Sequence, residues 1–284
     1  MSAAWDSADH PAPDTIGPLG WALALIRGLV LATVVFTGLL VLLAIRLIER
    51  PLCGQGRPVT PYITQTVCYI AFWIMGLRRE VVGTPMRHRG AVVANHTSWL
   101  DIFSLNAAQR IYFVSKSEVA SWPGIGWLAK ATGTLFIERN PKHARKQTEI
   151  FQRRLLDNHR LLFFPEGTST DGKQVLPFKT TLFQSFFTPE LRDAIWVQPV
   201  TVLYTAPVGA DPRFYGWWGD MSFGGHLVRT LASARQGKVT TIYHTPLAVA
   251  DFDNRKTLAQ ACETQVRSAH PSDQIAAPNT AELR

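Results

Sequence analysis

The sequence is poor in the residue types that several protein classes require. Its 284 residues include three cysteines, Cys53, Cys68 and Cys262, which are too few and too scattered for a disulfide framework. Charged residues make up 18% of the chain and hydrophobic residues 46%, which excludes disorder as the main state. There is no Gly-x-Ser-x-Gly motif, which counts against a serine hydrolase, and no cluster of metal ligands. We therefore expect a packed protein in a reducing or indifferent compartment, without a metal or another cofactor.

Acidic residues are also scarce beside basic ones. The chain has 21 Asp+Glu against 29 Lys+Arg, a formal net charge of +8. Such an excess favours anionic partners, including an anionic membrane surface, the phosphates of coenzyme A and an acidic carrier protein. No nucleic-acid recognition module is visible, so we expect no nucleic-acid partner. The mean hydropathy of +0.03 is high for a soluble enzyme and low for a polytopic transporter.

The apolar residues are concentrated in the first third of the chain. Gly28–Ile45 is an uncharged run of eighteen residues, close to the ~20 apolar residues that a membrane-spanning helix needs. A second run ends with the short apolar stretch Val67–Leu77, which favours an interfacial or half-inserted helix, with a second span as the alternative. We therefore predict a membrane anchor over residues 21–80 and a disordered arm over residues 1–20.

The flanks of the long apolar run indicate its orientation. The arm before it is acidic, whereas Arg46, Arg50 and Arg57 follow it. Positive residues remain on the cytoplasmic side of a membrane, so the sequence predicts an inner-membrane protein whose catalytic domain faces the cytoplasm.

Beyond about Val81 short β-branched runs alternate with helical patterns. This alternation predicts an α/β fold, with a largely parallel mixed sheet covered by helices, over residues 81–250, followed by a C-terminal helix and a loose tail over residues 251–284. The expected strands are Ala91–Ala94, Ile111–Val114, Thr134–Ile137, Leu161–Phe164, Ile195–Leu203 and Val239–Tyr243. The expected helices are Trp99–Ala108, Gly124–Ala131, Pro141–Asn158, Lys179–Phe187 and Asn254–Ala269.

The most informative segment follows the first of these strands. Asn95 and His96 lie at the strand's end, and Ser98 and Asp101 have the Ser-x-x-Asp spacing of a helix start. His96 and Asp101 can meet if His96 precedes the helix and Asp101 lies in its first turn, because residues five apart within one helix diverge by about 140°. A carboxylate on one imidazole nitrogen leaves the other free to accept a proton. The alternative is a buried structural histidine beside a helix cap.

Two further strands end in polar residues. Leu161–Phe164 leads into Pro165-Glu166-Gly167-Thr168, and a strand at Gly133–Ile137 leads into Glu138-Arg139. The carboxyl ends of parallel strands are where α/β folds place ligand contacts. The alternatives are an ordinary turn for the first segment and a surface ion pair for Arg139.

These residues resemble the glycerophospholipid acyltransferase family, whose best-known members are the 1-acylglycerol-3-phosphate acyltransferases. The resemblance covers about residues 85–205 and four motifs in order. The motifs are His96-x4-Asp101, Gly133–Arg139, Phe164–Thr168 and the Pro-containing strand Val197–Val202.

The resemblance implies direct transfer of a fatty acyl group from an acyl thioester, acyl-CoA or acyl carrier protein, to the hydroxyl of a lysolipid. His96 would act as general base, oriented by Asp101. The residues implied in substrate binding are Asn95, Arg139, Glu166, Gly167, Thr168 and Lys179. The first-choice acceptor is 1-acyl-sn-glycerol-3-phosphate, giving phosphatidic acid.

Three departures favour a second acceptor or a second class of function. Thr180-Thr181 replaces a usual glycine, Gln198 replaces an apolar residue, and Tyr215–Met221 resembles the bacterial branch that acylates lyso-ornithine lipid. That acceptor lacks phosphate, which puts Arg139 in doubt as a phosphate ligand. The rivals from other classes are a non-catalytic lipid-binding membrane protein with an acyltransferase fold and a lysophospholipid hydrolase.

Overall fold

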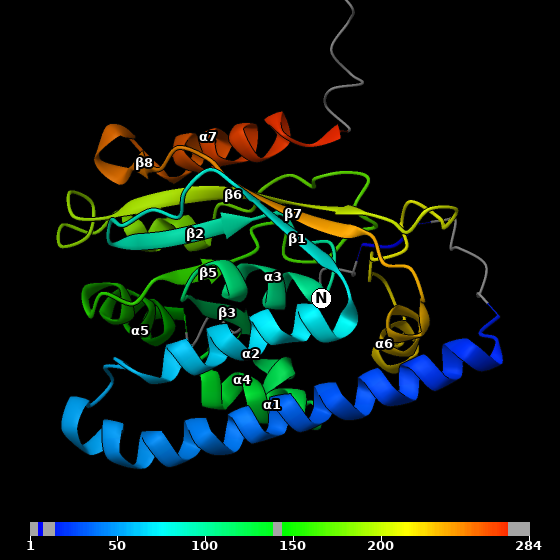
Figure 1. Cartoon of the computed structure of the whole chain (residues 1–284). Coiled ribbons are helices and arrows are strands. Elements are labelled where there is room, and N and C mark those ends of the chain that lie inside the picture. Colours follow the sequence, from blue (N-terminus) through cyan, green and yellow to red (C-terminus); the bar gives the residue numbers. More distant parts are fainter. Residues whose placement is uncertain (1–4, 8–14, 139–143, 272–284) are drawn as a thin grey trace, which may run out of the picture.

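The computed structural model describes residues 5–7, 15–138 and 144–271, and a mixed β-sheet lies at its centre (Figure 1). The strand order is β1-β7-β6-β2-β5-β3-β4, with β8 against β6. Strands β2 to β6 run parallel, whereas β1, β7 and β8 run in the opposite direction. The strands are β1 Arg78–Val82, β2 Gly90–Ala94, β3 Tyr112–Lys116, β4 Leu135–Ile137, β5 Leu161–Phe163, β6 Trp196–Thr205, β7 Lys238–Tyr243 and β8 Leu247–Ala248. The predicted fold class is confirmed.

Helices cover both faces of this sheet. One layer contains α2, α3 and α6, with α1 outside it, and the other contains α5, α7 and the short 3-10 helix η3. The helices are α1 Pro18–Cys53, α2 Thr60–Met75, α3 Leu100–Ala108, α4 Ile125–Thr132, α5 Ala144–Leu156, α6 Phe223–Ala232 and α7 Arg255–Ser268. The 3-10 helices are η1 Ser117–Ser121, η3 Leu182–Phe186 and η4 Val249–Asp251.

Strand β2 shows how the two layers share the sheet. All five of its residues are buried, because both faces of a parallel sheet are covered. Ala91 and Val93 pack among α5, η3 and α7, while Val92 and Ala94 pack among α1, α2, α3 and α6. The strand's uninterrupted apolar run follows from burial on both sides. Its chain therefore leaves the core at Ala94 with the next residues held tightly at the sheet edge.

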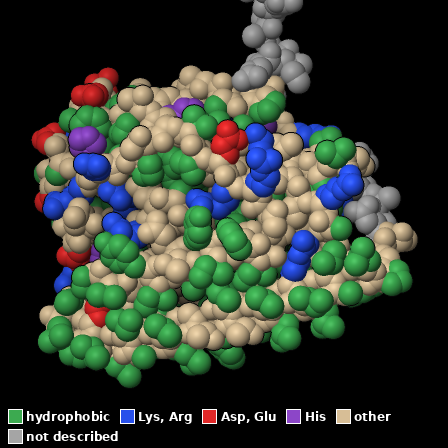
Figure 2. Space-filling model, viewed as in Figure 1, with side chains coloured by type: hydrophobic (Ala, Val, Ile, Leu, Met, Phe, Trp, Pro, Cys, Tyr) green, Lys and Arg blue, Asp and Glu red, His purple; other side chains and the backbone are tan. Residues whose placement is uncertain are grey.

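Helix α1 is long and apolar, and it lies along the catalytic domain (Figure 1). It is the helix in the described part of the chain that is long and apolar enough to cross a membrane, and 11% of its most apolar window is buried. Exposed apolar side chains on α1 and α2 form a band along one side of the molecule, bordered by Lys and Arg (Figure 2). The helix begins at Pro18, and residues 1–4 and 8–14 lie outside the described part.

Some elements differ from the sequence expectation. The expected helix Lys179–Phe187 is the short 3-10 helix Leu182–Phe186, because the amide of Lys179 donates to the carbonyl of Pro165 instead of entering a helix. Strand β1 begins at Arg78, inside the segment expected to belong to the anchor, where three consecutive charged residues hide the strand pattern. Helix α6 was not expected, since it starts at Phe223-Gly224-Gly225.

Candidate active site

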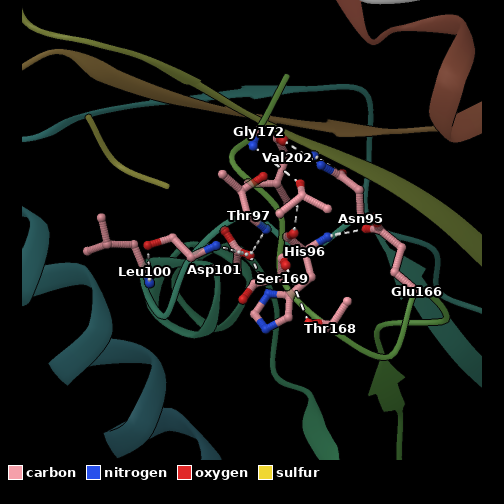
Figure 3. Close-up of polar contacts among 12 residues, drawn as sticks. Asn95, His96, Thr97, Leu100, Asp101, Glu166, Thr168, Ser169, Gly172 and Val202 are labelled. Atoms are coloured by element: carbon pink, nitrogen blue, oxygen red, sulfur yellow. Dashed lines mark hydrogen bonds and ion pairs between the residues drawn. The ribbon is translucent and has the colours of Figure 1, made fainter. Parts of the chain in front are cut away.

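The functional residues of the sequence motifs gather at one edge of the sheet. Strands β2 and β5 pair in parallel, so their carboxyl ends bring the segments after Ala94 and Phe163 together. Strand β4 runs parallel to β3 and ends at the same edge. This edge holds His96 and Asp101 beside Glu166 (Figure 3). Such edges are the ordinary place for active sites in α/β proteins.

His96 and Asp101 form a hydrogen-bonded pair. The distance from His96 Nδ1 to Asp101 Oδ2 is 2.7 Å, with His96 in the loop before α3 and Asp101 in the first turn of the helix. Asp101 is fully buried, whereas 19% of the His96 side chain is exposed. Because Asp101 holds Nδ1, the Nε2 atom is the imidazole nitrogen available to a substrate. Among the residues that the structure describes, none hydrogen-bonds to this Nε2.

Four donors surround the Asp101 carboxylate. Besides His96, the amides of Thr97 and Ser98 donate to Oδ2 at 2.8 and 3.0 Å, and the Tyr204 hydroxyl donates to Oδ1 at 2.8 Å. Burial and the neighbouring carboxylate raise the pKa of Tyr204 well above its usual value, so this hydroxyl keeps its proton and remains a donor. The carboxylate is thus fixed on both oxygens before any substrate arrives.

The ring of His96 is also held by stacking. It lies parallel to the ring of Phe164, with centroids 4.0 Å apart and an interplanar angle of 9°. The backbone carbonyl of His96 accepts a hydrogen bond from the amide of Thr170. The imidazole is therefore oriented by a neighbouring ring, a carboxylate and its own backbone.

Glu166 is a buried bridge rather than an open ligand. Its Oε1 accepts the amide of His96 at 2.6 Å and its Oε2 accepts the amide of Leu176 at 2.7 Å, with 1% of the residue exposed. Both carboxylate oxygens thus bind backbone. The residue joins the His96 loop to the segment that follows β5, and a contact with the acceptor would have to act through His96.

The ionisation of Glu166 makes a prediction about stability. Burial raises its pKa from 4.5 to about 8, outweighing the two backbone amides that lower it. Between these values the folded protein keeps the proton that the unfolded chain has lost, so the stability contributed by Glu166 is complete below pH 4.5 and is lost as the pH rises towards 8. We expect the melting temperature of the wild type to fall over this window more steeply than that of Glu166→Gln. Equal slopes in thermal unfolding of the two proteins would contradict this prediction.

The other predicted binding residues have different surroundings. Asn95 is buried and pairs with the backbone of Val202 on β6, its Nδ2 donating to the carbonyl at 2.9 Å and its Oδ1 accepting the amide at 2.8 Å. Gly167 has φ +73°, and a side chain there would meet the ammonium of Lys179. Lys179 is exposed, and Thr168 is half-buried in the same loop. Lys179, Gly167 and Thr168 are thus adjacent, whereas Asn95 joins two strands.

Arg139 lies outside the described residues, directly after Glu138. The carboxyl end of β4 directs the chain towards the site edge, but the surroundings of Arg139 stay a prediction. Among residues 5–7, 15–138 and 144–271 no group of three or more His, Cys, Asp and Glu side chains is arranged to hold a metal ion.

Sequence reasoning missed several residues around the site. Tyr204 lies at the end of β6, and no spacing signal links it to Asp101. The amide of Trp217 donates to the carbonyl of Thr97, which places the Tyr215–Met221 segment against the His96 loop. Gln198, noted as a departure from the family, is fully buried, and its side chain bonds the backbones of Thr84, Met86 and His244. Long-range partners of this kind have no local sequence signature.

The fold and this site define an acyltransferase. Residues 78–203 match the acyltransferase family. The chain is 59% identical over 261 residues to a lyso-ornithine lipid O-acyltransferase of Rhodobacter capsulatus, which covers 92% of this chain and 95% of the relative. This chain belongs to the acyltransferase family and is an enzyme of lysolipid acylation.

Two other comparisons show how far the similarity extends. A 1-acyl-sn-glycerol-3-phosphate acyltransferase of Neisseria gonorrhoeae is 41% identical over 98 residues, which is 33% of this chain and 37% of that protein. The crystal structure of the 1-acyl-sn-glycerophosphate acyltransferase PlsC from Thermotoga maritima has a TM-score of 0.60 at 20% identity, covering 89% of this chain and 96% of that one. This second likeness shows a shared fold.

Proposed function

We propose that this enzyme transfers a fatty acyl group from acyl-CoA or acyl carrier protein to the free hydroxyl of lyso-ornithine lipid. The observation that carries the chemistry is the His96–Asp101 pair, whose Nε2 is the free nitrogen at the ligand edge of the sheet. The acceptor is supported by the relative from Rhodobacter capsulatus, which matches nearly the whole chain. This support favours the second acceptor of the sequence analysis over 1-acyl-sn-glycerol-3-phosphate.

The proposed reaction needs one proton acceptor and no covalent enzyme intermediate. His96 Nε2 takes the proton of the acceptor hydroxyl as its oxygen attacks the thioester carbonyl. The tetrahedral intermediate then collapses, the carbon–sulfur bond breaks, and the imidazolium returns its proton to the leaving thiolate. The buried Asp101 carboxylate stabilises the imidazolium that exists between these two steps.

The segment that distinguishes the acceptor lies beside this chemistry. Trp217 binds the Thr97 carbonyl and packs edge-on against Trp122 and Phe223, with ring centroids 6.2 Å away in each case. An ornithine headgroup carries an amine and a carboxylate and no phosphate, so this acceptor does not require a phosphate ligand. The Trp217 segment is thus placed to contact the part of the acceptor in which the two lysolipids differ.

One assay tests the acceptor. The purified full-length enzyme is given lyso-ornithine lipid or lysophosphatidic acid, each with labelled acyl-CoA or labelled acyl carrier protein. We expect label in ornithine lipid. Label found only in phosphatidic acid would refute the acceptor, and fatty acid released without any acceptor would indicate a hydrolase.

We further propose that α1 and α2 lie together in the membrane surface instead of spanning it. Arg27 in the middle of α1 donates to the carbonyls of Leu231 and Ser233 at the end of α6. Near the other end of α1, Glu49 accepts the amides of Val59 and Thr60 at the start of α2. A helix that crossed the bilayer would lose the first of these contacts, because α1 would leave the catalytic domain.

The seating has a direct topological test. In the plane of the inner membrane, the N-terminal arm and the catalytic domain remain on the same, cytoplasmic side. A protease site introduced before residue 18 is then cleaved in inverted vesicles, as an exposed loop of the catalytic domain is. Cleavage of that site only from the opposite side of the membrane would establish a spanning α1.

A further inference from the structure

A cavity with an unpaired arginine lies at the junction of α2 and β1, away from the catalytic residues. Its volume is about 490 Å³. The lining residues are Tyr69, Phe72, Trp73, Gly76, Leu77, Arg78 and Arg79. Two of them are exposed aromatics at the end of α2, Tyr69 at 53% and Trp73 at 81%. The cavity therefore combines cationic groups with aromatic side chains that are open to the surroundings.

Arg79 is held in place by rings and has no acidic partner. Its guanidinium carbon is 5.4 Å from the ring centre of Tyr69 and 5.6 Å from that of Phe72. The ionisable groups near it are Tyr69, Tyr243 and Cys68. Within the described part of the chain, its guanidinium has no hydrogen-bond acceptor and no carboxylate. A half-buried guanidinium fixed by stacking, with its donors unused, is prepared to bind an anion with two oxygens.

Two more arginines add positive charge at this corner. Arg78 lines the cavity and is exposed. Arg27 approaches from α1, its NH2 lying 3.5 Å from where a side-chain carbon on Gly76 would be. Three arginines thus converge on the α2–β1 corner, at the end of the apolar band formed by α1 and α2 (Figure 2).

We propose that this cavity binds the phosphate of an anionic membrane phospholipid, distinct from the acceptor that is acylated. The proposal rests on the membrane seating described above. In that seating, Tyr69 and Trp73 lie where aromatic side chains settle, between acyl chains and headgroups, and Arg79 lies at the depth of the phosphates. A soluble acidic protein would not need these exposed aromatic side chains.

The sheet links this site to the catalytic residues by register. Arg79 pairs with Val239 on β7, and Val239 pairs with Tyr204 on β6. Neighbouring strands are about 4.8 Å apart, so Arg79 and Tyr204 lie at one level of the sheet, roughly 10 Å apart. Tyr204 binds Asp101. A lipid phosphate held by Arg79 would therefore set the depth of the catalytic pair relative to the headgroup layer.

The test is a titration of the detergent-solubilised full-length enzyme with dioctanoyl phosphatidylglycerol, followed by native mass spectrometry. We expect Arg79→Gln to weaken binding roughly 10-fold, because a bidentate charged contact is lost. The matched control is Arg50→Gln, which removes an equal charge from the exposed end of α1 outside the cavity. This control should bind like the wild type. Equal affinity in the Arg79 variant and the wild type, or equal loss in both variants, overturns the proposal.

Further arms separate the alternatives. Arg79→Lys keeps the charge but loses the planar fork, so its affinity should lie between those of wild type and Arg79→Gln. Glycerol 3-phosphate binding as tightly as the lipid would indicate a site for soluble phosphate esters and overturn the lipid assignment. Acyl transfer in neutral detergent should be unchanged in Arg79→Gln, and an unchanged melting curve excludes misfolding. Failure of the wild type to bind neutral vesicles would refute the seating alone, because the titration needs no bilayer.

Discussion

Replacing His96 by alanine is expected to lower kcat for acyl transfer by roughly 10²–10⁴-fold, which is the contribution of a positioned general base. The variant retains the acceptor site but has no group that can take the hydroxyl proton. The measurement is transfer of labelled acyl groups to lyso-ornithine lipid under saturating acceptor and donor. Transfer at the wild-type rate would remove His96 from the mechanism.

The chain offers a matched control for this variant. His88 stacks on the ring of Trp196 with centroids 4.4 Å apart, much as His96 stacks on Phe164 at 4.0 Å, but His88 is exposed and has no carboxylate partner among the described residues. His88→Ala therefore removes a stacked imidazole without removing a base. It should retain wild-type turnover. A similar loss in both variants would mean that stacking, not proton transfer, explains the effect of His96→Ala.

The His96 variant should also stay folded. Asp101 keeps the amides of Thr97 and Ser98 and the hydroxyl of Tyr204, so the buried carboxylate is still satisfied. Its melting temperature should thus change little. Inactivity with an unchanged melting curve separates the chemical role of His96 from any structural one.

The catalytic pair could be predicted because its geometry is set locally. The Ser98-x-x-Asp101 spacing indicates a helix start, and a helix start places His96 in the preceding turn. The structure has the two side chains 2.7 Å apart. The strand pattern around Ala91–Ala94 is equally local, since burial on both faces gives a continuous apolar run. Local signals were therefore enough for the fold class and the position of the pair.

The surroundings of the pair could not be predicted because they come from distant parts of the chain. Tyr204 reaches Asp101 across 103 residues, and the Glu166 carboxylate reaches the His96 amide across 70. The sequence suggested that Glu166 contacts the acceptor, whereas both its oxygens bind backbone in the structure. A carboxylate after a strand has the same local sequence in either role. Only tertiary contacts distinguish them.

The apolar segments illustrate the same limit. Length and composition of α1 fit a membrane-spanning helix, and these properties are visible in the sequence. The hydrogen bonds from Arg27 to the end of α6 join residues more than 200 positions apart. Such contacts decide whether an apolar helix stands apart from a domain or lies along it, and hydropathy does not contain them.

Replacing Asp101 by asparagine is expected to lower kcat by roughly 10²–10³-fold while leaving the protein folded. An asparagine oxygen in the place of Oδ2 still accepts the amides of Thr97 and Ser98 and the Nδ1 proton of His96. Its amide nitrogen then donates to the Tyr204 oxygen, because a hydroxyl can turn and accept. The orientation of His96 is kept, and the lost part is the negative charge that stabilises the imidazolium.

Two companion variants separate charge from structure. Asp101→Ala leaves several buried donors without an acceptor, at about 1–3 kcal/mol of stability for each, so it should be strongly destabilised as well as inactive. Tyr204→Phe removes one donor and no charge, so its kcat should fall about tenfold or less, with a stability loss of about 1–3 kcal/mol. Measured kcat and thermal unfolding together order the three variants. If Asp101→Asn kept wild-type turnover, the carboxylate would be a helix cap that orients His96 without taking part in the proton transfer.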